Sequence, residues 1–237
     1  MDTETISQED SKINTEVIGW IGLADDDYVA ARLLINNALL VQGAILSVTA
    51  IEKYLKMVHK IRRLSFPRRD PHNLLDLYNS VKSKGLDMGL NVDYLALLVK
   101  VYRMRYPDKI EADFNFVLNQ AKLLAALDES VYAIRHRLVV VSTQPEEKRE
   151  SKFEYWISSN YNHLMRMNHC YCAEVKRENL FKNPSIYREV RFVKGKTWME
   201  AGYTAAVEDD SVYNLEGLRP GETDRVFHFQ KAPIDMS

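Results

Sequence analysis

The sequence has few cysteines, no excess of basic residues and no long apolar run. Its 237 residues include two cysteines, Cys170 and Cys172. A disulfide across a single intervening residue is strained, so we expect both thiols to be reduced. The 32 basic and 33 acidic residues give a formal net charge of −1. This balance argues against a dedicated duplex-DNA binder, whose affinity depends on neutralising many phosphates.

The apolar runs are too short for a membrane span, so we expect no membrane helix. The first twelve residues, MDTETISQEDSK, are polar and acidic. They resemble neither a signal peptide nor a transit peptide. We therefore expect a cytoplasmic protein. Glycine-rich phosphate loops, serine nucleophile elbows and His-Glu-x-x-His motifs are also missing, and this favours no particular cofactor.

The residues that are present predict a mainly α protein. With 46% hydrophobic and 27% charged residues, the chain can bury a sizeable core. We expect a frayed segment over residues 1–20 and an up-down antiparallel bundle of four to five helices over 21–141. The polar stretch 142–150 is the expected boundary, and 150–237 is expected to form a smaller mixed extension.

Helical periodicity and end signals set the expected elements. Asp70 and Pro71 are a favoured N-cap and first helical residue. The residue before a proline disfavours the helical conformation, so we expect the fourth helix to end before Pro107. In the extension, the alternation in 186–193 predicts a strand, and 225–230 is its expected partner. The expected helices span residues 25–38, 39–61, 71–84, 92–104 and 108–139, with a further helix over 153–179.

The helix expected over 39–61 has two apolar faces separated by one polar stripe, which is typical of a central helix. The stripe consists of Gln42, Thr49, Lys53, Lys56 and Lys60. It suits a nucleotide or RNA backbone, but a solvated helix face has the same pattern.

Glu52 lies beside this stripe, inside the apolar arc, and a buried carboxylate needs a partner. Lys56 is one turn later, at the favourable spacing for an ion pair. The pair either fixes the position of the helix or lets Glu52 orient Lys53 and Lys56 toward a phosphate. His59, near the same arc, is expected to be a core residue.

A second basic group is expected around the start of the third helix. The loop RRLSFPRRDPHN carries four arginines and ends near His72, and Arg103 and Arg105 follow the fourth helix. Together they could form a basic mouth for a phosphate, although a solvated loop has the same composition.

Two further groups have mainly structural interpretations. Asp128 and Arg135 share the apolar side of the fifth helix, which predicts a buried pair or a dimer contact. His163, His169, Cys170 and Cys172 lack the paired spacing of a zinc site, so we expect no metal.

The order of four segments resembles the HEPN domain, a family of small helical bundles, over residues 20–140. The segments are LADDDYVAARLL, QGAILSVTAIEKYLKMV, DPHNLLDLY and YRMRYPD. The residues that match the family pattern are Glu52, Lys53, Lys56, His72, Leu74, Arg105, Tyr106 and Pro107.

The resemblance implies a bundle that is often homodimeric, in which members are either metal-independent ribonucleases of toxin type or non-catalytic binding partners. The ribonuclease members carry Arg, four to six residues, then His, and this spacing is missing here. The resemblance therefore favours a non-catalytic module that binds nucleotide, RNA or a protein partner, such as a nucleotidyltransferase. The expected ligand-binding residues are Gln42, Glu52, Lys53, Lys56, His72, Arg103, Arg105 and Tyr106.

Two alternatives stay open. One is a ribonuclease with a rearranged site, in which His72 is the general base and Arg69 or Arg105 stabilises the charged phosphate. The other is a structural adaptor that uses the second apolar face of the central helix for dimerisation.

Overall fold

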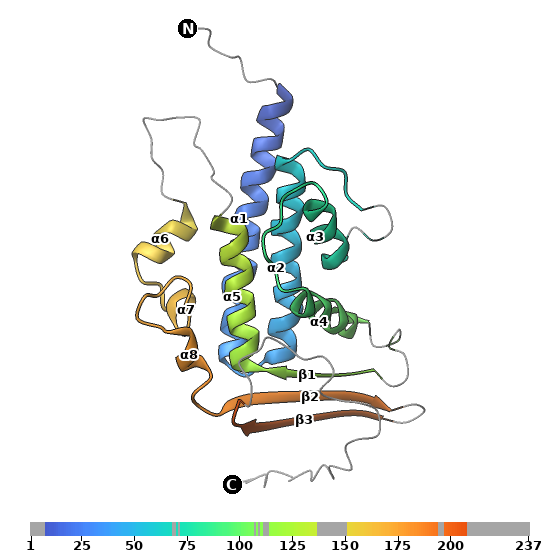
Figure 1. Ribbon diagram of the computed structural model, residues 1–237, viewed down its shortest axis with the longest axis vertical. Coiled ribbons are helices and arrows are strands. Elements are labelled where there is room, and N and C mark those ends of the chain that lie inside the picture. Colours follow the sequence, from blue (N-terminus) through green and yellow to red (C-terminus); the bar gives the residue numbers. More distant parts are fainter. Residues whose placement is uncertain are drawn as a thin grey trace, which may run out of the picture.

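Three long helices form the centre of the molecule (Figure 1). They are α1 (Gln8–Asn36), α2 (Leu40–Ile61) and α5 (Gln120–His136). In Figure 1, α1 runs in the opposite direction to α2 and α5. The computed structural model describes residues 8–67, 70, 72–106, 108, 110, 114–136, 151–193 and 197–207.

Short elements flank this centre on both sides (Figure 1). Beside α2 lie α3 (Leu74–Lys82), α4 (Val92–Tyr102) and the 3-10 turn η1 (Arg103–Arg105); beside α5 lie α6 (Lys152–Ser158), α7 (Asn162–Met165) and α8 (Arg177–Leu180). No helix among the described residues is long and apolar enough to cross a membrane.

A small sheet closes one end of the helices (Figure 1). Its antiparallel strands are β1 (Asn115–Asn119), β2 (Ser185–Val193) and β3 (Thr197–Ala205), in the order β1-β2-β3. Phe116 is paired with Val190, and both are buried. Since paired residues in an antiparallel ladder share a face, this face of the sheet covers the helices.

α1 and α2 make the most extensive helix contact of the described part. Gly43 on α2 permits it, since a Cβ there would lie 2.4 Å from Ile35 Cγ1 and 3.1 Å from the backbone nitrogen of Ile35. Ala31, one turn before Ile35 on α1, and Ala44, next to Gly43 on α2, are both fully buried. Small side chains thus let the two backbones approach closely, which fixes how α2 lies against α1.

The mainly helical prediction is confirmed, and so is the second helix, which runs over Leu40–Ile61 as expected. The first helix begins at Gln8 instead of near Asp25, so residues 8–20 are helical, not frayed. The acids Asp25, Asp26 and Asp27 are therefore far from the start of this helix. They lie in the middle of α1, where they cannot stabilise the helix dipole.

The three aspartates instead pair with three different elements. Asp25 Oδ1 accepts a hydrogen bond from Arg135 of α5 at 2.6 Å, and Asp26 Oδ1 lies 2.5 Å from Lys152 Nζ of α6. Asp27 Oδ2 lies 2.6 Å from Lys53 Nζ of α2. One acidic turn therefore positions three neighbouring helices around α1.

The helix expected over 108–139 was wrong at its start. Residues 115–119 form β1, and α5 begins only at Gln120. Phe114, Phe116 and Leu118 are buried while Asn115 and Val117 are half-buried. This period of two is that of a strand, and pairing with the distant β2 stabilises it.

The third helix also begins later than expected. Asn73, not Asp70, is its N-cap: the Asn73 side chain accepts hydrogen bonds from the backbone nitrogens of Leu75 and Asp76. Asp70 instead accepts one from the backbone nitrogen of His72, at 2.9 Å. The helix ends at Lys82, and Gly85 follows in the left-handed region with a φ of 84°.

The single helix expected over 153–179 is divided into α6, α7 and α8. Asn160 and Met167 have positive φ angles of 52° and 57°, which interrupt a right-handed helix. The strand over 186–193 is confirmed as β2. Its partner is β3, while the expected partner 225–230 lies outside the described residues.

The extension is not separate from the bundle in the described residues. Phe153, Leu164 and Val190 belong to the same hydrophobic cluster as the core of α1, α2 and α5. The polar segment 142–150 that we expected as a boundary lies outside the described residues.

A buried polar network joins α1, α5 and α7. Arg32 and Asp128 are fully buried and form an ion pair through Nη1 and Oδ2. Arg32 also donates from Nη2 to the carbonyl of Arg166, and from Nε to that of His163 at 3.3 Å. Tyr28 donates to Asp128 Oδ1 at 2.7 Å. Asp128 and Arg135, for which we expected a buried pair or a dimer contact, each pair with a residue of α1 instead.

Removing the guanidinium should destabilise the fold strongly. We expect Arg32→Met to lower the free energy of unfolding by about 3–5 kcal/mol, because it leaves the Asp128 carboxylate buried without its counter-ion. Urea denaturation measures the change. Lys152→Met is the control, since its pair with Asp26 is exposed and should contribute less than about 1 kcal/mol. Equal losses in the two variants would contradict this role of Arg32.

The second buried carboxylate should make stability depend on pH. Burial raises the pKa of Asp25 to about 6, although Arg135 and Tyr54 oppose the shift. Between its unfolded pKa and about 6, the folded state holds a proton that the unfolded state has lost, so the contribution of Asp25 to stability falls as pH rises. We expect the unfolding free energy of wild type, relative to Asp25→Asn, to decrease by about 2–3 kcal/mol between pH 4 and pH 7. A difference that is flat, or rises with pH, would refute the shift.

Candidate functional site

Three of the predicted residues meet where the N-terminal end of α3 approaches α2. Glu52 Oε1 lies 2.5 Å from Lys56 Nζ, one turn later on α2. The same oxygen lies 2.9 Å from Nδ1 of His72, just before α3. Lys56 Nζ and His72 Nδ1 are 3.4 Å apart. We call these three residues the Glu52 cluster.

The Glu52 cluster opens to solvent through its imidazole. The side chain of His72 is 60% exposed, while those of Glu52 and Lys56 are 12% and 16% exposed. Asp70 holds the backbone of His72 from one side, and the Asn73 cap fixes the start of α3 on the other. The Glu52 carboxylate and the Lys56 amine thus lie on the buried side of the cluster, and His72 forms its accessible surface.

This arrangement leaves one ring nitrogen for an external group. With Nδ1 beside Glu52, Nε2 of His72 has no partner among the described residues. A carboxylate that accepts from Nδ1–H orients the ring. Nε2 is then a proton acceptor in the neutral ring and a donor in the protonated ring. The cluster can therefore hydrogen-bond a phosphate or exchange a proton with it.

The rest of the predicted lysine stripe is neutralised by α1. Lys53 Nζ lies 2.6 Å from Asp27, and Lys60 Nζ lies 2.8 Å from Glu16. Thr49 donates to the carbonyl of Ile45, and Gln42 is exposed near the start of α2. The stripe is therefore largely a line of contacts between two helices, and Lys56 is the amine that belongs to the Glu52 cluster.

The predicted basic mouth is described only in part. Arg103 and Arg105 are exposed in η1, and Arg105 Nη1 donates to the Tyr102 hydroxyl at 2.6 Å. The Arg105 guanidinium lies 5.0 Å from the ring centre of Tyr102 and 6.0 Å from that of Tyr106. Arg105 is thereby stacked against aromatic rings. Arg68 and Arg69 lie outside the described residues.

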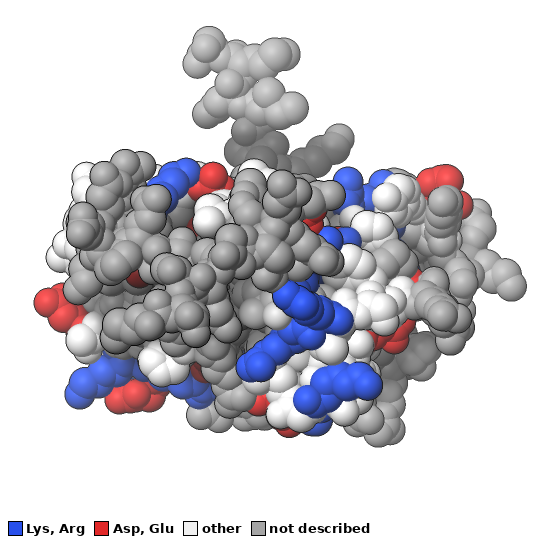
Figure 2. Space-filling view, turned by 90° about the horizontal axis from the view of Figure 1, so that it is seen from above, with Lys and Arg blue, Asp and Glu red and all other residues white. Residues whose placement is uncertain are grey.

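Basic side chains gather on the end of the molecule that Figure 2 shows from above. α2 ends toward this face (Figure 1), and its last residues are followed by the exposed Arg62 and Arg63. Lys60, in the last turn of α2, is partly exposed in its pair with Glu16. Exposed basic side chains thus follow the end of α2, with acidic groups such as Glu16 beside them.

His59 is a buried core residue, as expected. Its Nδ1 lies 3.2 Å from the carbonyl oxygen of Ser65, and its Nε2 lies 3.1 Å from that of Leu77. It thereby connects α2 to the loop after it and to α3, and takes no part in the Glu52 cluster.

The cysteines and histidines of the 163–172 region contact protein groups. No group of three or more potential ligands capable of holding a metal occurs in the described part of the chain. His169 and Arg177 instead share the carboxylate of Glu129, at 3.2 Å and 2.7 Å. Burial raises the pKa of Cys170 to about 12, and the nearby Asp128 and Glu129 add to the shift.

Sequence reasoning missed the α1 residues that compensate the predicted cations. Glu16, Asp27 and Arg32 were not assigned partners, because such contacts join residues far apart in the chain. A usable signal was present, since Tyr28 and Arg32 are spaced by four in the stretch YVAARLLI, whose other residues are apolar.

The chain matches no family model, no curated protein and no solved structure in the comparisons made with each. The likeness to HEPN domains therefore depends on the four segments quoted above.

The Cys170 thiol should react slowly in the folded protein. Because the pKa of Cys170 is raised to about 12, its thiolate fraction near pH 8 is about a thousandfold below that of a thiol with the ordinary value. In a Cys172→Ser variant we expect iodoacetamide to label the remaining thiol very slowly in the native state and rapidly in urea. Mass spectrometry follows the labelling, and fast native labelling would contradict the burial of Cys170.

Proposed function

We propose that the protein is a helical module of HEPN type that binds the phosphate of RNA or of a nucleotide at the Glu52 cluster without cleaving it. The single observation that supports this proposal is the meeting of Lys56 and an exposed His72 around one nearly buried carboxylate. Lys56 donates hydrogen bonds through its ammonium, and Nε2 of His72 donates one when the ring carries both protons, so both can bind a phosphate oxygen.

The carboxylate has a positioning role in this proposal. Glu52 shares one oxygen between Lys56 and His72, which limits the freedom of both side chains. An ordered donor loses less conformational entropy when a ligand binds than a free lysine does. The half-buried site also screens the charge of Lys56 less than bulk water would.

Nearby positive charge supports a polyanion as the ligand. Arg62 and Arg63 follow the same helix, and the loop that leads to His72 contains Arg68 and Arg69. Several weak phosphate contacts along one strand add up to salt-dependent affinity. Single-stranded RNA can use such a row, whereas a mononucleotide can use only the Glu52 cluster itself.

The contact between Glu52 and His72 also supports a second candidate, a metal-independent ribonuclease of toxin type. Nε2 of His72 would take the proton of a ribose 2′-hydroxyl. The 2′ oxygen would then attack phosphorus as the bond to the 5′ oxygen breaks, and water would protonate that leaving oxygen. Arg69 or Arg105 would stabilise the charge on the phosphate.

Binding of labelled RNA in the presence of EDTA tests the proposal. We expect single-stranded RNA to bind with an affinity that falls as salt rises. Lys56→Met and His72→Ala should each weaken binding about tenfold, because each removes one phosphate donor. Fluorescence anisotropy gives the affinity, and a denaturing gel shows whether the RNA stays intact. Lys53→Met is the matched control on the same helix, since its amine is paired with Asp27, and should change binding by less than about twofold.

The other outcomes decide between the candidates. Cleavage that persists in EDTA and is lost in His72→Ala would establish the ribonuclease. An absence of both binding and cleavage would reject both proposals and leave a structural adaptor. The homodimer and the nucleotidyltransferase partner that the HEPN resemblance implies are further proposals, and neither outcome of this assay depends on them.

A further inference from the structure

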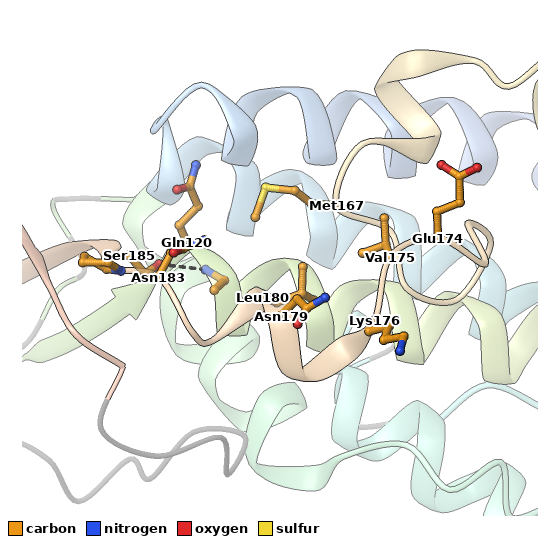
Figure 3. Close-up of a pocket in the computed structure, with 11 residues that line it drawn as sticks. Gln120, Met167, Glu174, Val175, Lys176, Asn179, Leu180, Asn183 and Ser185 are labelled. Carbon is orange, nitrogen blue, oxygen red and sulfur yellow. Dashed lines mark hydrogen bonds between the residues drawn. The ribbon is translucent and has the colours of Figure 1, made fainter.

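We propose that a second site, a pocket of about 380 Å³ where β2 begins beside the first turn of α5, binds a free amino acid with a neutral, polar-tipped side chain, of the type of glutamine. The pocket lies between Gln120 of α5, the segment 167–176, α8 and the start of β2 (Figure 3). Its volume is in the range of small-ligand sites and too small for a dinucleotide.

The pocket has three chemically different parts (Figure 3). One end carries the charged side chains of Glu174 and Lys176, which point apart. The middle is apolar and lies between Met167, Val175 and Leu180. The other end carries the side chains of Gln120, Asn183 and Ser185 (Figure 3).

The charged end selects for a ligand with both signs of charge. Neither Glu174 nor Lys176 has a side-chain partner among the described residues. An anionic ligand would be attracted by Lys176 and repelled by Glu174, and a cationic ligand would meet the reverse. Both side chains are exposed, so they can turn toward the α-ammonium and the α-carboxylate of one amino acid that enters between them.

The middle and the far end define the side chain of the ligand. The apolar walls suit an aliphatic stem of two or three carbons. Beyond them, Asn183 has no side-chain partner in the described part, and Gln120 uses only its amide nitrogen, which donates to the carbonyl of Ile35 at 2.7 Å. A carboxamide offers an NH2 group with two donors and a carbonyl acceptor in the same plane, so a second carboxamide is its natural complement.

Ser185 is committed to the protein and does not need a ligand. Its hydroxyl accepts from the backbone nitrogen of Ala121 at 3.1 Å and donates to Asn119 Oδ1 at 3.3 Å. It thereby fixes the start of β2 against the start of α5. The far end of the pocket is consequently built on two joined elements and is formed before a ligand arrives.

Paired ligands and variants test the site on the full chain by isothermal titration calorimetry. We expect L-glutamine to bind more tightly than L-leucine, which lacks the polar tip. Glutaramic acid, which lacks the α-ammonium, and L-glutaminamide, which lacks the α-carboxylate, should bind more weakly than glutamine. Each lost charge contact should reduce affinity about two- to fivefold, because both protein groups are solvent-accessible.

The variants assign each charge to its partner. Glu174→Gln should weaken glutamine binding but leave that of glutaramic acid unchanged. Lys176→Gln should weaken glutamine binding but leave that of glutaminamide unchanged. Both substitutions are on exposed side chains and should preserve the fold, and Lys84→Gln, an exposed lysine after α3, is the control.

Three results would overturn the proposal. They are a failure of glutamine to saturate the wild type by about 10 mM, equal affinity for leucine and glutamine, and equal effects of a variant on glutamine and on the analogue that lacks the matching charge. The Glu52 cluster is built from α2 and the start of α3, so RNA binding there can fail or succeed independently of this result.

Discussion

The fold depends on one buried ion pair, between Arg32 of α1 and Asp128 of α5. Burying two charges is costly unless their remaining hydrogen-bonding groups are also satisfied. Tyr28 donates a further hydrogen bond to the Asp128 carboxylate, and the carbonyls of His163 and Arg166 accept hydrogen bonds from the Arg32 guanidinium. Asn168 extends the network by donating to the Tyr28 hydroxyl at 2.9 Å. The hydrogen-bonding groups of this ion pair are satisfied only when α1, α5 and the α7 segment meet. The pair thereby specifies how α7 docks on α1.

The same helix sets how much charge is left for a ligand. The acidic residues of α1 neutralise Lys53, Lys60, Arg135 and Lys152, each from a different position along the helix. What remains for a ligand on α2 is the Glu52 cluster. A polar stripe that looks like a binding surface in sequence is, in the folded chain, mainly an interface between two helices. The proposed phosphate site is correspondingly small.

Local signals predicted the local structure well. The two apolar faces of α2 gave its limits, the spacing of Glu52 and Lys56 gave their ion pair, and the alternation in 186–193 gave β2. The errors arose where distant residues decide. Residues 115–119 become a strand because β2 pairs with them. The stretch 153–179 is interrupted at Asn160 and Met167, on either side of the carbonyls that bind Arg32. Of the candidate site, the sequence identified Glu52, Lys56 and His72 but could not show that Lys53 and Lys60 are neutralised from α1.

The hydrogen bonds from Arg32 to two backbone carbonyls affect where the chain can be truncated. Backbone carbonyls are present whatever side chains occupy positions 163 and 166. The contact of Arg32 with this segment should therefore tolerate substitutions at these two positions but not deletion of the segment. An excised helical core that stops near residue 140 would leave the guanidinium without two of its acceptors and Phe153 missing from the shared core. We therefore expect that a fragment able to fold alone, or to be joined to another polypeptide, extends at least through α7.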